Sequence, residues 1–404
     1  MKNDNRNFMM FAVLAVLLLF AWPLVMNKIM PPANPPVTKI EGGKTQVQPN
    51  PSTPTSANPA AIRNLNQVLK ETAGQRIAID TPTLKGSINL KGGRIDDLLL
   101  ARYKETIDKN SPPIRLFSPA GTTDAYFGEF GWTGDGVTTP GPDTVFSTKD
   151  TVLAPGRPVT LDWANPAGLH FRIRIAIDDN YMFTVDQLVG NATSQPVTLR
   201  PYALISRAGV SKDAQSNNHI GPIGFFCRIW NGNAQPGANY FDNTGGWLGF
   251  GDKYWLAALI PAQATAVHSG FPAKTNDHYQ ADVTPAKPIT VAAGRGKGTR
   301  TLFFAGAKEV NLLDRYEDQL KIEHFGRAID WGWFEIIEKP IFKYLDWLFR
   351  SIGNFGVAIM LLTVTIRLLI FPIAQRQFAS MAQMRAIQPK MKALQEKHKD
   401  DKQR

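Results

Sequence analysis

The feature that most constrains this chain is an apolar run of 21 residues, 353–373, which carries a single charge, Arg367. At about 1.5 Å per residue, a helix of that length spans a hydrocarbon core of roughly 30 Å. A buried helix of a soluble protein can have a similar composition, but a length near 20 residues favours a membrane span. Phe371-Pro372 stands at its end, where proline is tolerated. The run predicts a transmembrane helix.

A second apolar run, Phe8 to Met26, contains no charge. The alternative to a membrane anchor is a cleaved signal peptide, which has a shorter apolar core and a cleavage site of small residues. Here the run continues through Trp22 and Pro23 into Asn-Lys with no such site. This pattern favours an uncleaved transmembrane helix over 8–27.

The charges around the two runs predict their orientation. Residues 374–404 contain eight Lys or Arg and three Asp or Glu, whereas the charges of 335–350 balance. The positive-inside rule therefore places the tail after the second span in the cytoplasm. Lys2 and Arg6 precede the first span, which then runs from inside to outside. We expect everything between the spans to lie outside the cytoplasm.

The region between the spans has two parts of different composition. Residues 31–60 contain eight prolines and no aromatic residue, which predicts a flexible, partly extended tether. Residues 62–318 are rich in short strand-like runs separated by turn signals, typical of an antiparallel β-sandwich. In the run HFRIRIAI, from His170 to Ile177, the apolar residues alternate with Arg172 and Arg174. We expect the two arginines on a solvated strand face.

The β-rich region contains no motif of catalysis or metal binding. Its histidines are scattered without ligand spacing, and Cys227 is the one cysteine, which excludes an internal disulfide and a cysteine-based zinc site. The basic segment 294–298 predicts a surface hairpin rather than a phosphate loop. Asp96-Asp97 and Asp178-Asp179 fit turns better than acid–base catalysis. No enzyme, cofactor or metal is predicted, although a site built from distant residues would leave no such motif.

A belt of aromatic residues precedes the second span. Between 330 and 352 the charges at 335, 339, 343, 346 and 350 form one helical stripe, and the other faces are apolar. Trp331, Trp333 and Trp347 suit the headgroup level of a bilayer. A core helix of the outer domain is the alternative, but the position next to a span favours a helix lying in the membrane interface. Pro340 is expected to break or kink it.

Arg367 lies six residues before the end of the run, about 9 Å at helical rise and so in the inner half of the bilayer. Exposure to lipid costs about 2.5–3.5 kcal/mol on insertion scales. One interpretation is that the side chain snorkels to the cytoplasmic headgroups. The other is that it faces a water-filled cavity or polar groove. Thr363, one turn earlier, and Gly356, two turns before that, share its face, so the second interpretation predicts a polar seam.

The tail is predicted to be a basic helix with an apolar stripe at 378, 381, 384, 387, 391 and 394, split or kinked at Pro389. It either rests on anionic lipid or docks partners through its methionine face. The net charge of +11 agrees with anionic partners, such as lipid headgroups or ribosomal RNA.

These residues resemble a known family. The segment GNFGVAIMLLTVTIRLLIFPIAQRQFASMAQMRAIQPK, with its lone arginine, terminal proline and SMAQMR run, is similar to the YidC family of bacterial membrane protein insertases. So are WFEIIEKPIFKYLDWL, GGWLGFGDKYWLAALIP, the anchor and the Pro-rich tether. The resemblance implies a mixed membrane protein with a periplasmic β-supersandwich related to galactose mutarotases. It also implies a membrane core of five helices besides the N-terminal anchor, with a polar groove that receives client segments.

On that pattern, Arg367 is the groove arginine and Thr363 lines the groove. The implied partners are client membrane proteins, the Sec translocon, the ribosome and targeting factors at the tail, and anionic lipids, in the bacterial inner membrane. The chain stops in the first cytoplasmic loop of the pattern. We therefore expect either the N-terminal part of a longer insertase or a product unable to form the groove.

The predicted organisation has seven segments: a cytoplasmic N-terminus (1–7), transmembrane helix 1 (8–27), linker (28–61), periplasmic β-supersandwich (62–325), interfacial amphipathic helix (326–352), transmembrane helix 2 (353–373) and cytoplasmic helical tail (374–404). The leading hypothesis for function is membrane protein insertion, alone or with the Sec translocon. The alternatives are a membrane-anchored sugar-binding or mutarotase-like periplasmic domain, and a two-span structural tether. The sugar-binding alternative predicts a catalytic Glu and His in one cleft and assigns no task to Arg367.

Overall fold

The computed structural model describes residues 38–41, 44–47, 62–209, 219–226, 229–230, 239–273 and 278–397. The predicted first transmembrane helix lies outside these residues. So does the linker, except for a two-stranded antiparallel hairpin of β1 (Thr38–Glu41) and β2 (Lys44–Val47). The chain divides into two compact units, one ending at Ile329 and one beginning at Asp330. Each is described by itself.

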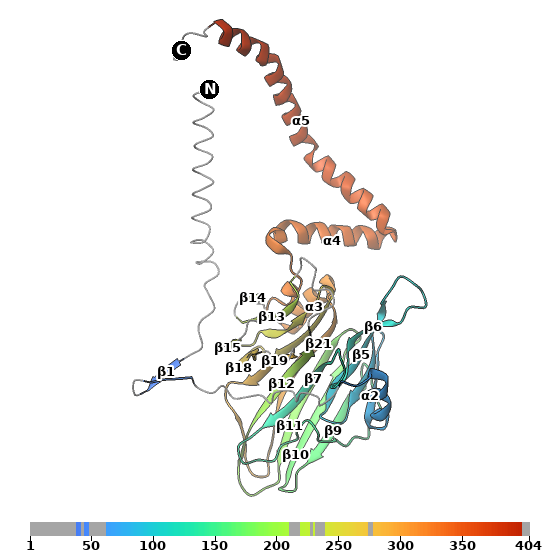
Figure 1. Cartoon of the computed structure of the whole chain (residues 1–404), viewed down its shortest axis with the longest axis vertical. Coiled ribbons are helices and arrows are strands. Elements are labelled where there is room, and N and C mark those ends of the chain that lie inside the picture. The colour runs from blue at the N-terminus through green and yellow to red at the C-terminus, as the bar shows by residue number, and fades with distance from the viewer. Residues whose placement is uncertain are drawn as a thin grey trace. The chain divides into compact units, whose positions relative to one another are not determined.

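The first unit is a sandwich of two large, almost entirely antiparallel sheets (Figure 1). The larger described sheet has the order β15 (Asn239–Thr244), β18 (Ala266–Phe271), β19 (His278–Pro285), β12 (Val197–Ala208), β7 (Tyr126–Thr133), β5 (Arg94–Lys104), β4 (Leu84–Asn89), β3 (Arg76–Asp80) and β8 (Val152–Leu153), with β20 (Ile289–Val291) on β12 and β6 (Pro113–Phe117) on β5. The smaller described sheet has the order β14 (Ile229–Trp230), β13 (Gly221–Phe225), β16 (Trp247–Gly251), β17 (Trp255–Pro261), β21 (Gly296–Ala307), β11 (Met182–Asn191), β10 (Leu169–Ile177) and β9 (Val159–Ala164). Among these strands, the β3–β8 pair is parallel.

Aromatic side chains from both sheets fill the space between them. Phe303 on β21 stacks on Phe117 at a ring distance of 5.9 Å and meets Phe130 edge-on at 5.7 Å. Trp132 packs against Phe171 at 5.1 Å. All five side chains are buried. The sandwich predicted for this region is therefore confirmed, and its core joins residues far apart in the sequence.

Strand β10 illustrates how the sequence specifies a face. Its apolar residues are buried, while Arg172 and Arg174 point away from the core, as predicted. Arg172 forms an ion pair with Asp162 at 2.7 Å, with half of each side chain exposed. The turn predicted at 178–180 is also confirmed, because Asp178 Oδ1 accepts hydrogen bonds from the backbone N–H groups of Asn180 and Met182.

Two expectations for this unit were wrong. Asp96 and Asp97 lie within β5 rather than in a turn. Asp96 is buried and binds Arg76 at 2.7 Å, and burial raises its pKa although Arg76 opposes the shift. Segment 294–298 is exposed, but it is not a hairpin: Gly294 and Arg295 belong to a turn, and residues 296–298 begin β21. The preceding strand β20 pairs with β12, whereas β21 pairs with β11 and β17.

Two helices and two tight turns complete the first unit: α2 (Leu65–Glu71), α3 (Val310–Leu320) and the 3-10 turns η1 (Ala73–Gln75) and η2 (Phe325–Ala328). Phe325 is fully buried against Trp247, with ring centroids 5.5 Å apart. The core therefore extends to Ala328, beyond the start of the amphipathic helix that we expected at residue 326.

The second unit contains η3 (Gly332–Phe334) and two helices, α4 (Glu335–Ile352) and α5 (Phe355–Lys397). The amphipathic helix begins at Glu335, and it runs through Pro340 without a break. Likewise, α5 continues through Pro372 and Pro389, so of the split or kink expected at Pro389 the split is wrong. Residues 355–379 are long and apolar enough to cross a membrane, by length and composition, and they include most of the predicted second span.

Candidate functional site

The junction between α4 and α5 is built from two residues. Gly353 has the left-handed conformation, φ 75°, and its N–H donates to the Phe349 carbonyl at 2.7 Å, which ends α4. Asn354 then caps α5, because its Oδ1 accepts from the N–H of Val357 at 3.2 Å. The sequence Gly-Asn thus stops one helix and starts the next, so that α4 folds back along α5.

One face of α5 is used for this packing. Ala358 is fully buried, and Leu362 and Thr365, at helical spacing from it, are half-buried. The Tyr344 hydroxyl of α4 lies 3.1 Å from Thr365 Oγ1, a hydrogen bond between the two helices. Sequence reasoning missed this pair, although the spacing of 358, 362 and 365 is a signal that could have found the face.

Arg367 and Thr363 lie on another face of the same helix. At about 100° per residue, Arg367 points roughly 160° away from Thr365. Arg367, Thr363 and Gly356 are all exposed, and no ion pair forms with Arg367 within the part of the chain that the structure describes. The Thr363 hydroxyl donates to the Ile359 carbonyl at 2.9 Å. The three residues of the predicted seam therefore lie on the side of α5 that stays exposed when α4 packs on it.

The aromatic belt is divided between the segment 331–334, which includes η3, and α4. Trp331 meets Phe342 edge-on at a ring distance of 5.6 Å, and Trp347 stacks on Tyr344 at 5.9 Å while remaining 59% exposed. The side chain of Trp333 lies outside the described residues. Ile336 and Ile337 are also exposed, so the helix presents a broad apolar surface.

The tail stripe is exposed on α5 at five of its six predicted positions: Phe378, Met381, Met384, Ile387 and Met391. The side chain of the sixth, Leu394, is outside the described residues. An exposed stripe on a basic helix suits either lipid or a partner, so both interpretations of the tail stay open.

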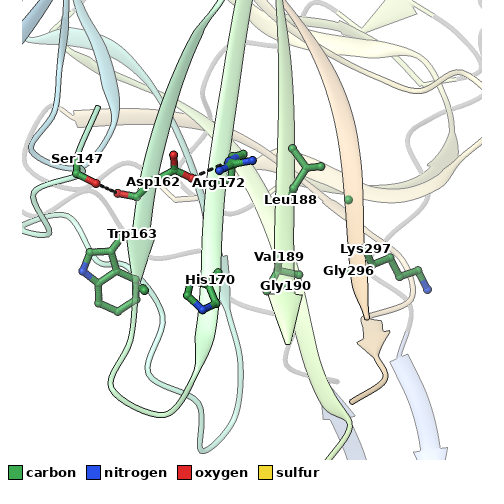
Figure 2. Close-up of a pocket in the computed structure, with 12 residues that line it drawn as sticks. Ser147, Asp162, Trp163, His170, Arg172, Leu188, Val189, Gly190, Gly296 and Lys297 are labelled. Atoms are coloured by element: carbon green, nitrogen blue, oxygen red, sulfur yellow. Dashed lines mark hydrogen bonds and ion pairs between the residues drawn. The ribbon is translucent and has the colours of Figure 1, made fainter. Parts of the chain in front are cut away.

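A hollow of about 650 Å³ on the outward face of the smaller sheet tests the sugar-binding alternative (Figure 2). His170 and Arg172 of β10, Asp162 of β9 and Lys297 of β21 line it, and glycines of β11 and β21 leave it open. It contains one histidine and no glutamate, and its carboxylate is occupied by the ion pair with Arg172. The hollow therefore lacks the Glu–His pair that this alternative predicts in one cleft.

Two protein families match this chain, one over most of the β-sandwich and one over the C-terminal helices. Residues 76–344 match the family described as YidC periplasmic domain, and residues 347–404 match the 60Kd inner membrane protein family. A relative from Zymomonas mobilis, named membrane protein insertase YidC, is 45% identical over all of this chain and 70% of its own length. A relative of the same name from Methylobacterium radiotolerans is 40% identical over all of this chain and 71% of its length.

A solved galactose mutarotase related enzyme from Lactobacillus acidophilus aligns with 57% of this chain and 97% of its own, at 10% identity and a TM-score of 0.41. A likeness of that size carries no conclusion about this chain. The two family matches meet near residue 345, so together they cover both units. The chain belongs to the YidC family of membrane protein insertases.

Proposed function

We propose that this chain inserts client membrane proteins into the bacterial inner membrane through the free face of α5. The β-sandwich lies in the periplasm, and α4 lies in the interface on the periplasmic side of the inner membrane. Residues 353–373 cross the bilayer, with the basic tail in the cytoplasm. The proposal includes a further span over residues 8–27, which lie outside the described residues. Clients contact the seam of Gly356, Thr363 and Arg367, which lines a polar groove completed by further membrane helices.

The mechanism is physical and makes or breaks no bond. A hydrated groove shortens the apolar path that a polar client segment must cross, and the positive charge of Arg367 attracts acidic residues in that segment. The arginine does not need to be neutralised within its own chain, because the client supplies the opposite charge. No cofactor is required for such a process.

The observation that carries the proposal is the division of α5 into two faces. Packing against α4 uses Ala358 and Thr365, and the opposite face keeps a charge at membrane depth exposed. An intramembrane arginine is costly unless water or a partner solvates it. The free face is therefore the surface that a client or another groove helix covers.

Site-specific photocrosslinking tests this assignment. A photoreactive side chain at Thr363 in a full-length insertase that carries this chain should crosslink a nascent single-span client. The same group at Leu362, one position away and half-buried on the α4 side, should crosslink the client at least several-fold less. Equal client crosslinking at the two positions would show that the free face is not the client surface.

Protease accessibility in spheroplasts tests the orientation. The charge asymmetry predicts that residues 62–318 are cleaved from outside, whereas the tail after Ile373 is protected until the inner membrane is opened. A tag after residue 397 and a tag in the exposed loop near Ile107 provide a matched pair of reporters. Cleavage at the tail tag in intact spheroplasts would overturn the orientation.

The remaining partners are those that the family implies, and for two of them the surface chemistry of the chain is suited. The basic tail would meet the ribosome, targeting factors or anionic headgroups, and the exposed aromatic surface of α4 would lie in lipid. The proposal includes cooperation with the Sec translocon, because a translocon releases apolar segments and these segments need a surface that receives them.

The contact between the tail and the ribosome can be tested by co-purification. Ribosomes should co-purify with the protein through its tail, and replacement of the tail lysines by glutamine should abolish this binding.

A further inference from the structure

The hydrogen bond between α4 and α5 has a defined direction. The Thr365 hydroxyl donates its one proton to the Leu361 carbonyl at 2.9 Å, within its own helix. The Tyr344 hydroxyl, 3.1 Å from Thr365 Oγ1, is therefore the donor of the bond between the helices. Both side chains are half-buried, and they share the helix faces of the buried residues Leu348 and Ala358. The bond is thus part of a packed interface.

This contact limits the angle between the two helices. Along the helix axes, Tyr344 lies about 13 Å and Thr365 about 16 Å from the junction at Gly353-Asn354. At a right angle these two points would be about 21 Å apart, whereas the two side chains and their hydrogen bond span about 17 Å between the axes at most. The angle is therefore below about 70°, and α5 leans back over α4 (Figure 1).

The apolar length of α5 is a second, independent indication of a tilt. Residues 355–379 are long and apolar enough to cross a membrane. This stretch is about 36 Å long at helical rise, roughly 6 Å more than a hydrocarbon core of about 30 Å, and a tilt of about 35° removes the excess. Length alone does not fix a tilt, but packing against a neighbouring helix does. With α4 in the interface plane, an angle below about 70° requires α5 to tilt by at least about 20°.

We propose that the Tyr344–Thr365 hydrogen bond holds α5 tilted and thereby positions Arg367 at the middle of the bilayer. Arg367 is the central residue of 355–379, so it lies about 15 Å from either headgroup layer when both ends of this stretch are at the hydrocarbon boundaries. Its side chain extends about 7 Å, which is too short to snorkel from there. The inference rests on the function proposed above, and it makes Tyr344 a positioning residue for the charge that clients meet.

An upright α5 would place the same residues at other depths. With Phe355 at the periplasmic boundary, Arg367 would lie about 3 Å on the cytoplasmic side of the midplane, and Phe378 would lie about 4 Å beyond the hydrocarbon. The tilt brings Phe378 into the hydrocarbon, while Arg376 reaches the headgroups with its long side chain. The cost of a charge is highest at the midplane. The tilt therefore places Arg367 where a polar client segment meets the largest barrier.

The depth of a nitroxide at position 378 tests the tilt. The label is attached to Phe378→Cys in the whole 404-residue chain, after Cys227→Ser has removed the native thiol. The chain is placed in phosphatidylcholine nanodiscs, and EPR power saturation with oxygen and a water-soluble nickel chelate gives the depth. In the parent chain the nitroxide should lie within the hydrocarbon. Tyr344→Phe should move it about 2–6 Å toward water, because one lost interhelical hydrogen bond shifts the packed fraction of α4 about three- to twentyfold.

Thr365 supplies matched controls for this measurement. Thr365→Ser keeps the hydroxyl and should give the parent depth. Thr365→Val keeps the branched shape without the acceptor, so it should move the nitroxide as Tyr344→Phe does. A nitroxide on Leu361→Cys, closer to the periplasmic end of the span, should move by less than about 2 Å in every variant, because its depth depends little on the tilt.

Insertion of two clients separates positioning from a general structural role. In a full-length insertase that carries this chain, Tyr344→Phe should reduce insertion of a client with an acidic crossing segment about threefold, the lower end of the shift expected for the hydrogen bond. A client with a neutral crossing segment should change by less than about 1.5-fold, because it does not use the charge of Arg367. Thr365→Ser should insert both clients as the parent does.

Three results would overturn the inference. One is a nitroxide at position 378 that lies in water in the parent chain, and another is equal depth in the parent and Tyr344→Phe. The third is an equal loss of both clients in Tyr344→Phe, which would show a structural role. The depth measurements contain no client, so they stand if the insertase function fails. Equal insertion of the acidic client by Arg367→Glu and the parent would remove the electrostatic function and leave the tilt.

Discussion

Arg367→Glu in a full-length insertase that carries this chain is expected to reduce insertion of a client with an acidic crossing segment by about tenfold or more. The reversal of charge turns an attraction into a repulsion at membrane depth, and about 1.4 kcal/mol suffices for a factor of ten. Arg367→Lys should retain most of the activity, because lysine keeps the point charge and loses the planar donor fork. The measurement is protease protection of a small one- or two-span client in cells depleted of the native insertase.

The dependence on client charge separates this mechanism from snorkelling. A client whose crossing segment carries lysine in place of its acidic residues should be inserted by Arg367→Glu at least as well as by the parent chain. Arg376→Glu is the matched control: it makes the same charge change about 13.5 Å further along α5, beyond the apolar run. If Arg367→Glu and the parent insert the acidic client equally, the electrostatic mechanism is wrong.

Phe303→Ala is expected to give the largest loss of stability in the β-sandwich. Phe303 is fully buried and lies within 6 Å, between ring centroids, of Phe117, Phe130 and Phe183. A methyl group on Gly128 would approach its ring to 2.9 Å, which shows how tightly the larger sheet closes on it. Removal of such a side chain costs about 3–5 kcal/mol because a cavity remains between the sheets.

The expected fall in the melting temperature of the sandwich is roughly 6–20 °C, measured by circular dichroism at strand wavelengths. Leu188→Ala on neighbouring β11 is the control. Leu188 is 40% exposed on the outward face, so its truncation should shift the melting temperature by no more than about 2 °C. A Phe303→Ala chain that melts together with the Leu188→Ala chain would contradict the packing described for the core.

The sequence alone predicted the features that depend on local patterns. The length of the run at 353–373 predicted a membrane span, and the period of two around Phe171 predicted which face of β10 is buried. The stripe of charges at 335–350 predicted an amphipathic helix. The face shared by Thr363 and Arg367 also follows from helical geometry alone. These features need no knowledge of the residues that pack against them.

Local sequence patterns gave wrong predictions for one strand and for two helices. The pair Asp96-Asp97 is typical of a turn, yet it lies in strand β5. The buried carboxylate of Asp96 is stabilised there by Arg76, which is 20 residues away in the sequence. Pro340 and Pro389 were expected to break or kink their helices, and both helices continue through the prolines without a break. Each proline removes one backbone donor, and the neighbouring turns keep their own bonds.

What only the tertiary structure decided is which surfaces are left free. Periodicity shows that a helix or strand has an apolar face, but it does not identify the partner that covers it. The Tyr344–Thr365 contact places α4 on one side of α5 and so leaves Arg367 exposed on the other. The exposed face of α5 thus depends on a contact between residues distant along the chain, and such contacts are set by packing, on which local sequence patterns carry little information.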